Sequence, residues 1–361
     1  MKICFISPKA YQLFNPEVKS TFGGAQVQLY YLANEFSGYK DVKIRFMVAD
    51  YGQDDVEIHK KIKVYKSLNL KDNFIKQIID FYRVFNKIDA DIYIQRAPSP
   101  FSGIIAFYCK ILNRKFAYMI GHDLETDGTY EKNNNLLKSF FANLVFKYSD
   151  LIITQNEYQK MNLKQRNIES TVIKSGYPVQ EYIETKKNYI LWVGRSESWK
   201  RPELFLKLAE QNPDFKFVMI CPPSTYNPQL SGRIKKEAQK LNNLKFIDFV
   251  PFNQIDKYFG EAKIFVNTST QEGFPNTFVQ AAKNKTPIVS LSVNPDNFLE
   301  RYECGFFCNN DIELINKNMN ILLSNKNLYK RMSENAYNYA KKNHDIKKNA
   351  EKFYELIGCL K

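Results

Sequence analysis

Residues 264–290 read IFVNTSTQEGFPNTFVQAAKNKTPIVS, and this stretch decides the fold class. It begins with a short apolar run at 264–266, which has the length and residue types of a buried parallel strand. A polar loop follows, then an amphipathic segment at 277–283 and a second apolar run at 286–290. The pattern therefore predicts a strand–loop–helix–strand unit in which Asn276 or Thr277 is the N-cap of the helix.

A helix that starts at the carboxyl end of a parallel strand favours an anion, because backbone N–H groups and the helix dipole both point there. Glu272 lies just before this helix start. Its carboxylate would repel a bound phosphate unless it contacts another group, such as a sugar hydroxyl. The alternative is an ordinary capped helix with a surface glutamate.

Strands and helices alternate in both halves of the chain, which predicts an α/β fold with two Rossmann-like, doubly wound domains. The first alternation starts with a strand at 2–7, a turn at Gly23-Gly24 and a helix at 26–36. The second starts with a strand at 189–193, after a polar segment at 176–187 that we interpret as a linker. The predicted domains are 1–178 and 179–343, followed by a closing helix at 344–361.

Two strand ends carry residues suited to chemistry. Gly194, Arg195 and Lys200 follow the strand at 189–193, and two cations five residues apart suit a diphosphate, although a solvated basic loop explains them as well. His122 ends the strand predicted at 115–120, where a structural histidine is the alternative. Arg96 also ends a strand, and a surface ion pair explains it equally well.

The formal net charge is +14, and residues 1–178 and 179–361 each carry +7. Such an excess suits an anionic partner: a nucleotide, an anionic membrane or nucleic acid. Nucleic acid is not expected, because no zinc-finger, helix-turn-helix or RNP-like motif occurs. The six cysteines and three histidines are scattered, which predicts reduced core cysteines and no metal site. No signal peptide and no apolar run of about 18 residues occurs, so we expect a cytoplasmic protein.

The segment Glu-Gly-Phe-Pro-Asn-Thr-Phe at 272–278, with Thr-Pro-Ile-Val-Ser at 286–290, resembles the donor-site signature of retaining GT-B glycosyltransferases of family 4. The resemblance implies that Glu272 contacts the hydroxyls of the donor sugar and that Arg195 and Lys200 hold its diphosphate. The family has a second Glu where this chain has Gln280, which can still hydrogen-bond a ribose.

The resemblance also implies roles for other residues. It places His122 near the reacting sugar carbons, and Asp123 and Glu125 as acceptor contacts. The nucleobase of the donor is expected to lie near Val250. The alternative is that the segment around Val250 is a simple turn. The implied donor-binding residues are Gly23, Gly24, Gly194, Val250, Phe274, Pro275, Asn276, Thr277 and Gln280.

The implied protein is a GT-B enzyme with two domains facing across a cleft, the first on the acceptor side and the second binding the nucleotide sugar. It would be a retaining, hexosyl-type glycosyltransferase with no metal and no cofactor besides its donor, since no Asp-x-Asp lies beside the site. The implied acceptor is a glycan or a lipid-linked glycan of cell-surface polysaccharide, such as lipopolysaccharide, at the inner face of the cell membrane.

Three questions stay open at this point. The basic charge and the aromatic helix at 136–148 fit peripheral membrane contact, but a buried helix and generic solubility fit them too. A catalytically silent GT-B subunit that binds sugar or a partner is the main rival, and Gln280 supports it. A nucleotide-sugar epimerase is the other rival, although its acid and base carboxylates cannot be placed.

Overall fold

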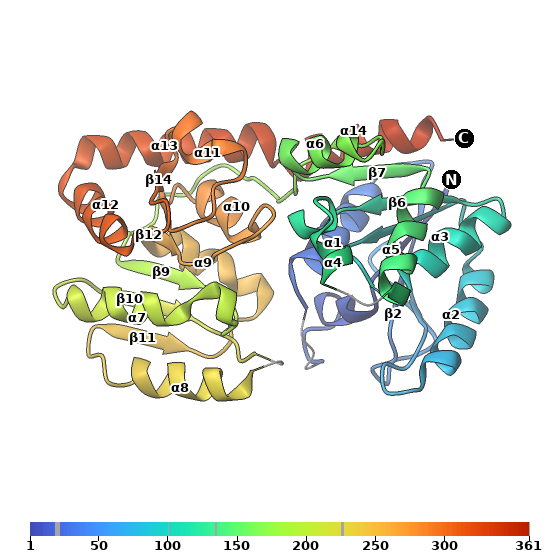
Figure 1. Ribbon diagram of the computed structural model, residues 1–361, viewed down its shortest axis with the longest axis horizontal. Coiled ribbons are helices and arrows are strands. Elements are labelled where there is room, and N and C mark those ends of the chain that lie inside the picture. Colours follow the sequence, from blue (N-terminus) through green and yellow to red (C-terminus); the bar gives the residue numbers. More distant parts are fainter. Residues whose placement is uncertain (19–21, 100, 134–135, 225–226, 361) are drawn as a thin grey trace. The chain divides into compact units, whose positions relative to one another are not determined.

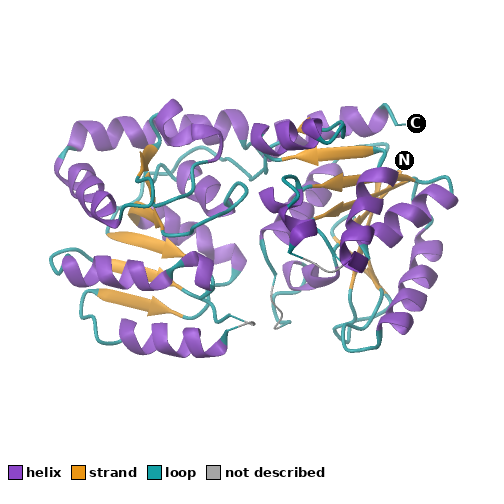
Figure 2. Cartoon of the chain, viewed as in Figure 1, coloured by secondary structure: helices purple, strands orange, loops and turns teal. Residues whose placement is uncertain are grey.

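The computed structural model describes residues 1–18, 22–99, 101–133, 136–224 and 227–360. It divides into two compact units, which are described separately: unit 1 is Met1–Pro178 with Asp345–Lys361, and unit 2 is Val179–His344. In each unit helices lie on both sides of a mainly parallel sheet (Figures 1 and 2). This arrangement confirms the predicted α/β class with two doubly wound halves.

The elements of unit 1 are β1 (Lys2–Ile6), α1 (Gly24–Phe36), β2 (Lys43–Val48), β3 (Val56–His59), β4 (Ile62–Lys66), α2 (Phe74–Ile88), β5 (Ile92–Arg96), α3 (Ser102–Ile111), β6 (Lys115–Met119), α4 (Thr129–Lys132), α5 (Leu136–Tyr148), β7 (Leu151–Thr154), α6 (Glu157–Gln165), β8 (Thr171–Val172) and α14 (Ile346–Gly358). Among the described residues its sheet has the order β3-β4-β2-β1-β5-β6-β7-β8.

The elements of unit 2 are β9 (Tyr189–Val193), α7 (Pro202–Gln211), β10 (Phe217–Ile220), α8 (Pro228–Ala238), β11 (Leu244–Ile247), α9 (Ile255–Glu261), β12 (Ala262–Asn267), α10 (Asn276–Lys283), β13 (Ile288–Ser290), α11 (Phe298–Arg301), β14 (Gly305–Phe307), α12 (Ile312–Ser324) and α13 (Lys326–Asn343). Its sheet, as far as the structure describes it, has the order β11-β10-β9-β12-β13-β14.

Among the described strands, β3 is the one that runs antiparallel to its neighbour, and the sequence did not predict it. It pairs with β4 so that His59 lies opposite Ile62. The connecting residues are Lys60 and Lys61, and Lys60 adopts a left-handed backbone with φ 56°. Tight hairpins are usually marked by Asn-Gly or Asp-Gly, so a Lys-Lys turn carries no signal in the sequence.

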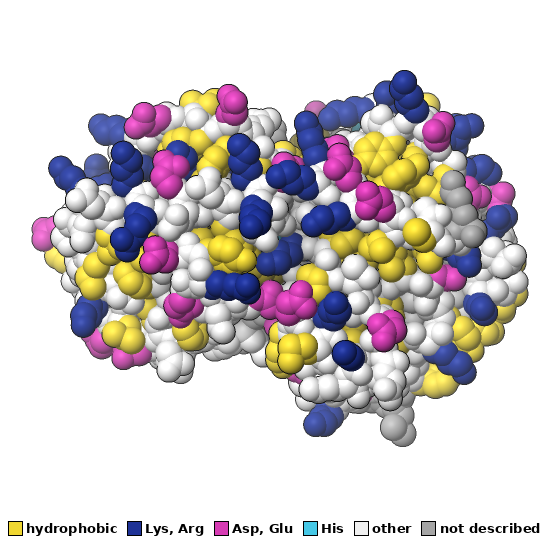
Figure 3. Space-filling view, turned by 90° about the horizontal axis from the view of Figure 1, so that it is seen from above, with side chains coloured by type: hydrophobic (Ala, Val, Ile, Leu, Met, Phe, Trp, Pro, Cys, Tyr) yellow, Lys and Arg dark blue, Asp and Glu magenta, His cyan; other side chains and the backbone are white. Residues whose placement is uncertain are grey.

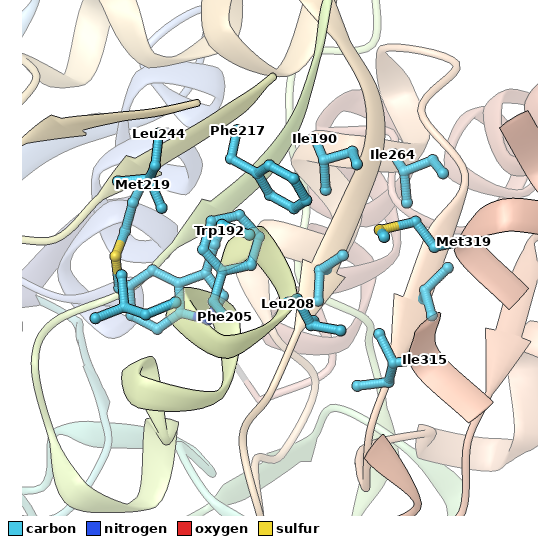
Figure 4. Close-up of a cluster of buried hydrophobic side chains, with 14 of the residues drawn as sticks. Ile190, Trp192, Phe205, Leu208, Phe217, Met219, Leu244, Ile264, Ile315 and Met319 are labelled. Atoms are coloured by element: carbon cyan, nitrogen blue, oxygen red, sulfur yellow. The ribbon is translucent and has the colours of Figure 1, made fainter. Parts of the chain in front are cut away.

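The core of unit 2 follows from alternation along its strands. Residues two apart point to the same face of a sheet, and Ile190 with Trp192 and Phe217 with Met219 form one apolar layer beside Ile264. Helices α7 and α12 cover this layer with buried apolar side chains (Figure 4). Those labelled in the figure are Phe205, Leu208, Ile315 and Met319.

Helix α14 is part of unit 1, although it follows unit 2 in the sequence. The side-chain amide of Asn349 donates to the carbonyl of Lys174 at 2.9 Å. The rings of Tyr39 and Tyr354 meet edge to face with their centroids 4.9 Å apart. These contacts attach α14 to the residues just after α1 and to the end of the first half of the chain.

The order of the strands marks one position in each sheet where ligands are expected. In unit 2 the chain first adds strands on one side of β9 and then returns to add β12 on the other side. In unit 1 the same reversal occurs between β1 and β5. At such a switch point the loops after the two central strands leave the carboxyl edge in opposite directions and open a crevice.

Charged side chains are spread over the surface. On the face in Figure 3, Lys and Arg side chains lie among acidic ones and do not gather in a single basic tract. Of the six cysteines none forms a disulfide, and all except Cys359 are buried, as expected for reduced core cysteines.

Candidate functional site

The switch point of unit 2 brings together the three charged residues that the sequence singled out. Arg195 and Lys200 lie in the loop after β9, and Glu272 lies in the loop after β12. Strands β9 and β12 are neighbours in the sheet. The two loops therefore leave the same edge side by side, at the place where an α/β sheet binds its ligand.

Lys200 and Glu272 form an ion pair across these loops. Their side chains are 23% and 16% exposed, so the pair is partly shielded from water. The hydroxyl of Ser269 donates to the same Glu272 oxygen at 2.9 Å. Glu272 is thus neutralised and held in place, which removes the expected repulsion between its carboxylate and a phosphate nearby.

Hydrogen bonds also connect the two loops through their backbones. The hydroxyl of Thr268 donates to the carbonyl of Lys200 at 2.6 Å, and the indole N–H of Trp192 donates to that hydroxyl at 2.9 Å. The backbone N–H of Thr270 donates to the carbonyl of Trp199 at 2.8 Å. The relative position of Lys200 and Glu272 therefore rests on a network that includes the buried core residue Trp192.

Gly194 and Arg195 form the turn from β9 into this loop. A Cβ atom on Gly194 would lie 3.0 Å from the ring of Trp192, so the glycine allows the loop to pass close to the indole. Arg195 is partly exposed. Its position directly after the central strand fits a side chain that reaches a ligand at the switch point.

The start of helix α10 differs from the prediction. The N-cap position is Pro275, with no hydrogen bond from a side chain, and Asn276 and Thr277 are already within the helix. The prediction of an Asn276 or Thr277 cap was therefore wrong, because the proline with φ −60° and ψ 127° sets the turn into the helix. No side chain caps this helix start, which is the arrangement that suits an anion.

Phe274 and Gln280 are both buried. The ring of Phe274 lies 4.6 Å from that of His344 and 5.2 Å from that of Phe298, so its side chain is part of the core. Within the described chain, the side-chain amide of Gln280 forms no hydrogen bond. Phe274 can meet a donor only through its backbone, whereas Gln280 keeps polar atoms available to a ligand.

Val250 is buried at the end of the loop after β11, and a short 3-10 helix follows at Phe252–Gln254. Phe249, just before it, is 50% exposed. The position of a nucleobase beside Val250 stays a prediction.

In unit 1 the loop after β6 contains His122, Asp123 and Glu125. The Nδ1 atom of His122 accepts from the N–H of Leu124 at 3.2 Å, so a neutral imidazole carries its proton on Nε2. The side chain is partly exposed, with Nε2 as its remaining donor.

Glu125 is directed into unit 1. One carboxylate oxygen accepts from the N–H groups of Gly121 and His122 at 2.8 and 2.7 Å, and the other accepts from the hydroxyl of Tyr118 at 2.7 Å. Burial raises the pKa of Glu125 to about 7, against the effect of these hydrogen bonds. Both oxygens are occupied within the unit, so Glu125 shapes the His122 loop, and its predicted acceptor contact finds no support in this geometry.

Asp123 and Arg96 are also engaged within unit 1. An oxygen of Asp123 accepts from the amides of Gln159 and Asn156 at 2.7 and 3.2 Å, and burial raises the pKa of its carboxyl. The guanidinium of Arg96 donates to Ser175 at 2.9 Å and is buried, which lowers its pKa to about 10. A surface ion pair therefore does not explain Arg96.

Gly23 and Gly24 lie at the start of α1, on the β1 side of the switch point of unit 1. Gly23 precedes the helix, and its N–H donates to the side-chain oxygen of Gln26 at 2.7 Å. Both glycines are exposed. A ligand can therefore approach the backbone here, as the predicted phosphate contact requires.

One residue of the unit 2 site was not singled out by the sequence. Glu197 lies between Arg195 and Lys200 and is only 4% exposed, and its Oε1 atom has no hydrogen-bond partner among the described residues. A buried carboxylate oxygen without a partner is rare and fits a position beside a ligand. Its place in the loop after the central strand was the only signal.

The described part of the chain lacks a metal-binding cluster and a membrane-spanning helix. No group of three or more His, Cys, Asp and Glu residues has the arrangement of a metal site. No described helix has both the length and the apolar character needed to cross a bilayer.

Comparison with known proteins gives the following findings. Residues 176–339 match the family model Glycosyl transferases group 1. An uncharacterised glycosyltransferase of Haemophilus influenzae is 25% identical over 216 residues, which cover 56% of this chain and 60% of that protein. An uncharacterised glycosyltransferase of Methanocaldococcus jannaschii is 25% identical over 365 residues, which cover 92% of this chain and 90% of that one.

Solved structures resemble the whole chain. Sucrose-phosphate synthase of Thermosynechococcus elongatus has a TM-score of 0.83 at 13% identity and covers 100% of this chain and 99% of its own. An Anabaena protein crystallised with UDP and glucose has a TM-score of 0.76 at 16% identity, with 99% and 100% covered. UDP-GlcNAc 2-epimerase of Neisseria meningitidis has a TM-score of 0.66 at 14% identity, with 99% of both chains covered.

These likenesses confirm the predicted GT-B fold, and the family match with the two relatives supports a glycosyltransferase. The epimerase has the same fold, so the fold alone does not separate the two activities. Family 4, retention of configuration, independence of metal and a role in surface polysaccharide stay predictions.

Proposed function

We propose that the chain is a retaining glycosyltransferase that moves a sugar from a nucleotide-diphosphate sugar to a glycan or lipid-linked acceptor in cell-surface polysaccharide biosynthesis. The observation that carries this proposal is the joined pair of loops at the switch point of unit 2, where Lys200 pairs with Glu272 and Arg195 lies in the same loop as Lys200. This segment lies within the part of the chain that matches the glycosyl transferases group 1 model.

In the proposed reaction the two cations act on the leaving group. Arg195 and Lys200 stabilise the negative charge that develops on the diphosphate as its bond to the sugar breaks, which lowers the barrier because the donors are already in place. Glu272 holds hydroxyls of the donor sugar. Its ion pair with Lys200 keeps both groups positioned while no donor is bound.

The other residues keep the roles that the family resemblance implies. His122 is assigned to the reacting sugar, Gly23 and Gly24 to the donor phosphates, and Asp123 to the acceptor. The proposal assigns no metal ion and no further cofactor to the reaction. It places the enzyme in the cytoplasm, at the inner face of the cell membrane.

The test is a thermal-shift and hydrolysis screen of the purified protein with UDP-, GDP-, ADP- and dTDP-sugars, with and without EDTA. A ligand at about 100 times its Kd adds roughly 2.7 kcal/mol of stability, so the correct donor should raise the Tm clearly. Slow hydrolysis of that donor in EDTA, with the anomeric configuration of the released sugar retained by NMR, supports the proposal.

Two outcomes would contradict the proposal. Donor binding without turnover, even with glycan and lipid-linked acceptors, would favour a silent binding subunit. Release of an epimerised sugar would favour an epimerase.

A further inference from the structure

Helix α2 of unit 1 exposes a line of apolar side chains. Ile75, Ile79 and Tyr82 follow the i, i+4, i+7 spacing of one helix face, and all three are exposed, Ile75 to 71%. The buried face of the same helix carries Phe81 and Phe85. Helix α2 therefore carries exposed apolar side chains beside its buried face.

Helices α3 and α5 continue this exposed apolar surface. The rings of Tyr82 and Tyr108 lie 5.1 Å apart and connect α2 to α3, and those of Phe107 and Tyr148 lie 5.8 Å apart and connect α3 to α5. Ile111, on α3, is 60% exposed. The three helices are neighbours in Figure 1. We name the exposed set Ile75, Ile79, Tyr82, Phe107, Ile111 and Leu112 the apolar helix face.

The backbones of α3 and α5 pack closely beneath this face. A Cβ atom on Gly103 would lie 2.3 Å from the carbonyl oxygen of Phe141, so only glycine permits the contact. The apolar helix face thus rests on a fixed pair of helices.

Most charges on the three helices are positive, although Lys76 pairs with Asp72 just before α2. The sequences of α2, α3 and α5 contain six Lys and Arg residues and one acid, Asp80. Asp80 pairs with Arg83 on its own helix. Lys110 and Lys147 form no ion pair with any described residue. The surface therefore combines exposed aliphatic and aromatic side chains with uncompensated cations.

We propose that the apolar helix face of unit 1 docks on the surface of an anionic lipid bilayer. Apolar side chains with adjacent Lys and Arg are the combination that binds in the interface of anionic membranes. A second copy of this chain is disfavoured as the occupant, because it would bring two surfaces of the same positive charge together. Docking would bring the enzyme to lipid-linked acceptors in that bilayer. This part of the inference rests on the proposed function.

The segment proposed to contact the membrane differs from the one that the sequence suggested. The sequence pointed to residues 136–148, the helix α5, as the candidate membrane segment. The exposed apolar side chains lie mainly on α2 and α3, and α5 adds Phe140, which is 56% exposed.

The test is co-sedimentation of the full-length protein with vesicles of phosphatidylcholine mixed with phosphatidylglycerol, and with vesicles of phosphatidylcholine alone. We expect binding to the anionic vesicles that weakens as salt is added. The double variant Ile75→Glu/Ile79→Glu should lower the partition coefficient by about tenfold or more, because it removes two inserting side chains and adds repulsion. Lys110→Ala and Lys147→Ala should each lower it by about fivefold.

Ile58→Glu is the matched control, since Ile58 is 67% exposed in the same unit but lies on β3 and not on the three helices. It should leave vesicle binding unchanged. No binding to anionic vesicles, equal binding to phosphatidylcholine alone, or equal losses in Ile58→Glu and the double variant would overturn the proposal. An acidic protein partner in place of the bilayer would give the first of these results.

The donor thermal shift separates this inference from the proposed function. The double variant should keep the full thermal shift with the donor, because it lies outside the unit 2 site. Vesicle binding that persists in a protein without any donor response would contradict the proposed function and leave the docking surface intact.

Discussion

Two glutamates at strand ends, Glu272 in unit 2 and Glu125 in unit 1, have opposite surroundings. Glu272 is partly exposed and pairs with Lys200 across two loops at the switch point. Glu125 is buried one strand away from its switch point and accepts hydrogen bonds from the backbone of its own loop. The strand end alone therefore does not identify a binding residue. We expect a binding residue where the glutamate lies at the switch point and has a charged partner in the neighbouring loop.

The largest expected effect is on the unit 2 side. Lys200→Ala should lower the rate of donor hydrolysis by about 10²-fold to 10³-fold, the cost of removing one preorganised donor to a developing anion. The rate is measured with the donor identified by the thermal-shift screen. Lys207→Ala is the control, because Lys207 is an exposed lysine on α7 of the same unit. Equal rates in both variants would remove Lys200 from the site.

The corresponding change on the unit 1 side should affect stability. Glu125→Ala leaves the N–H groups of Gly121 and His122 and the hydroxyl of Tyr118 without their acceptor, and should cost about 2–4 kcal/mol of unfolding free energy. Urea unfolding measures the loss. Glu169→Ala, at an exposed position of the same unit, should be neutral. A Glu125→Ala protein as stable as wild type would contradict the structural role assigned to this carboxylate.

His122 sharpens the comparison, because it lies in the loop that Glu125 holds and yet is assigned to the reaction. His122→Ala should lower turnover by about tenfold to 10²-fold while the donor still raises the Tm as in wild type. Steady-state rates and thermal shifts on the same preparation separate the two effects. Loss of the thermal shift together with turnover would instead assign His122 to donor binding.

The raised pKa of Glu125 predicts a pH dependence. Between its ordinary value of 4.5 and about 7, the folded protein binds this proton more often than the unfolded chain does, so its contribution to stability falls as pH rises through that window. The Glu125→Gln variant has a side-chain amide at this position, which does not titrate in this pH range. The stability of the variant relative to wild type should therefore increase by up to roughly 3 kcal/mol between pH 4.5 and 7 and then stay constant. A difference that does not change with pH would place the pKa near its ordinary value.

The smallest effect is expected for Gln280. Gln280→Glu introduces the residue that family 4 enzymes have at this position, and a carboxylate that accepts from ribose hydroxyls should tighten donor binding by about 1 kcal/mol. The Kd of the donor measures the gain. Weaker binding would indicate that the glutamine suits the site of this chain.

Much of the fold could be predicted from the sequence, since apolar runs and amphipathic periods mark parallel strands and crossover helices clearly. Strand β3 was missed because its Lys-Lys turn lacks the usual hairpin residues. The N-cap was missed because Pro275 sets the entry into α10 without a side-chain hydrogen bond. The first error concerns a hairpin turn and the second the start of a helix, and in both places the local residues give a weak signal.

Charge and spacing were enough to single out Arg195, Lys200 and Glu272 in the sequence, and the structure pairs Lys200 with Glu272, while their roles toward a donor stay predictions. The roles of other side chains were less predictable, because they depend on whether the side chain is buried. Phe274 belongs to the core and Glu125 to a loop network, and both follow from long-range packing that one sequence does not display. The direct pairing of Lys200 with Glu272 depends on the strand order, which places residues 72 positions apart in neighbouring loops.

The most direct test of the central claim is a calorimetric titration of the nucleoside diphosphate of the identified donor into wild type, Lys200→Ala and Lys207→Ala. The account predicts binding to wild type and Lys207→Ala with similar Kd values, and weakening by about tenfold or more in Lys200→Ala, because a charge-assisted contact to the diphosphate is lost. Equal Kd values in all three proteins would contradict the assignment of the switch point of unit 2 as the diphosphate site.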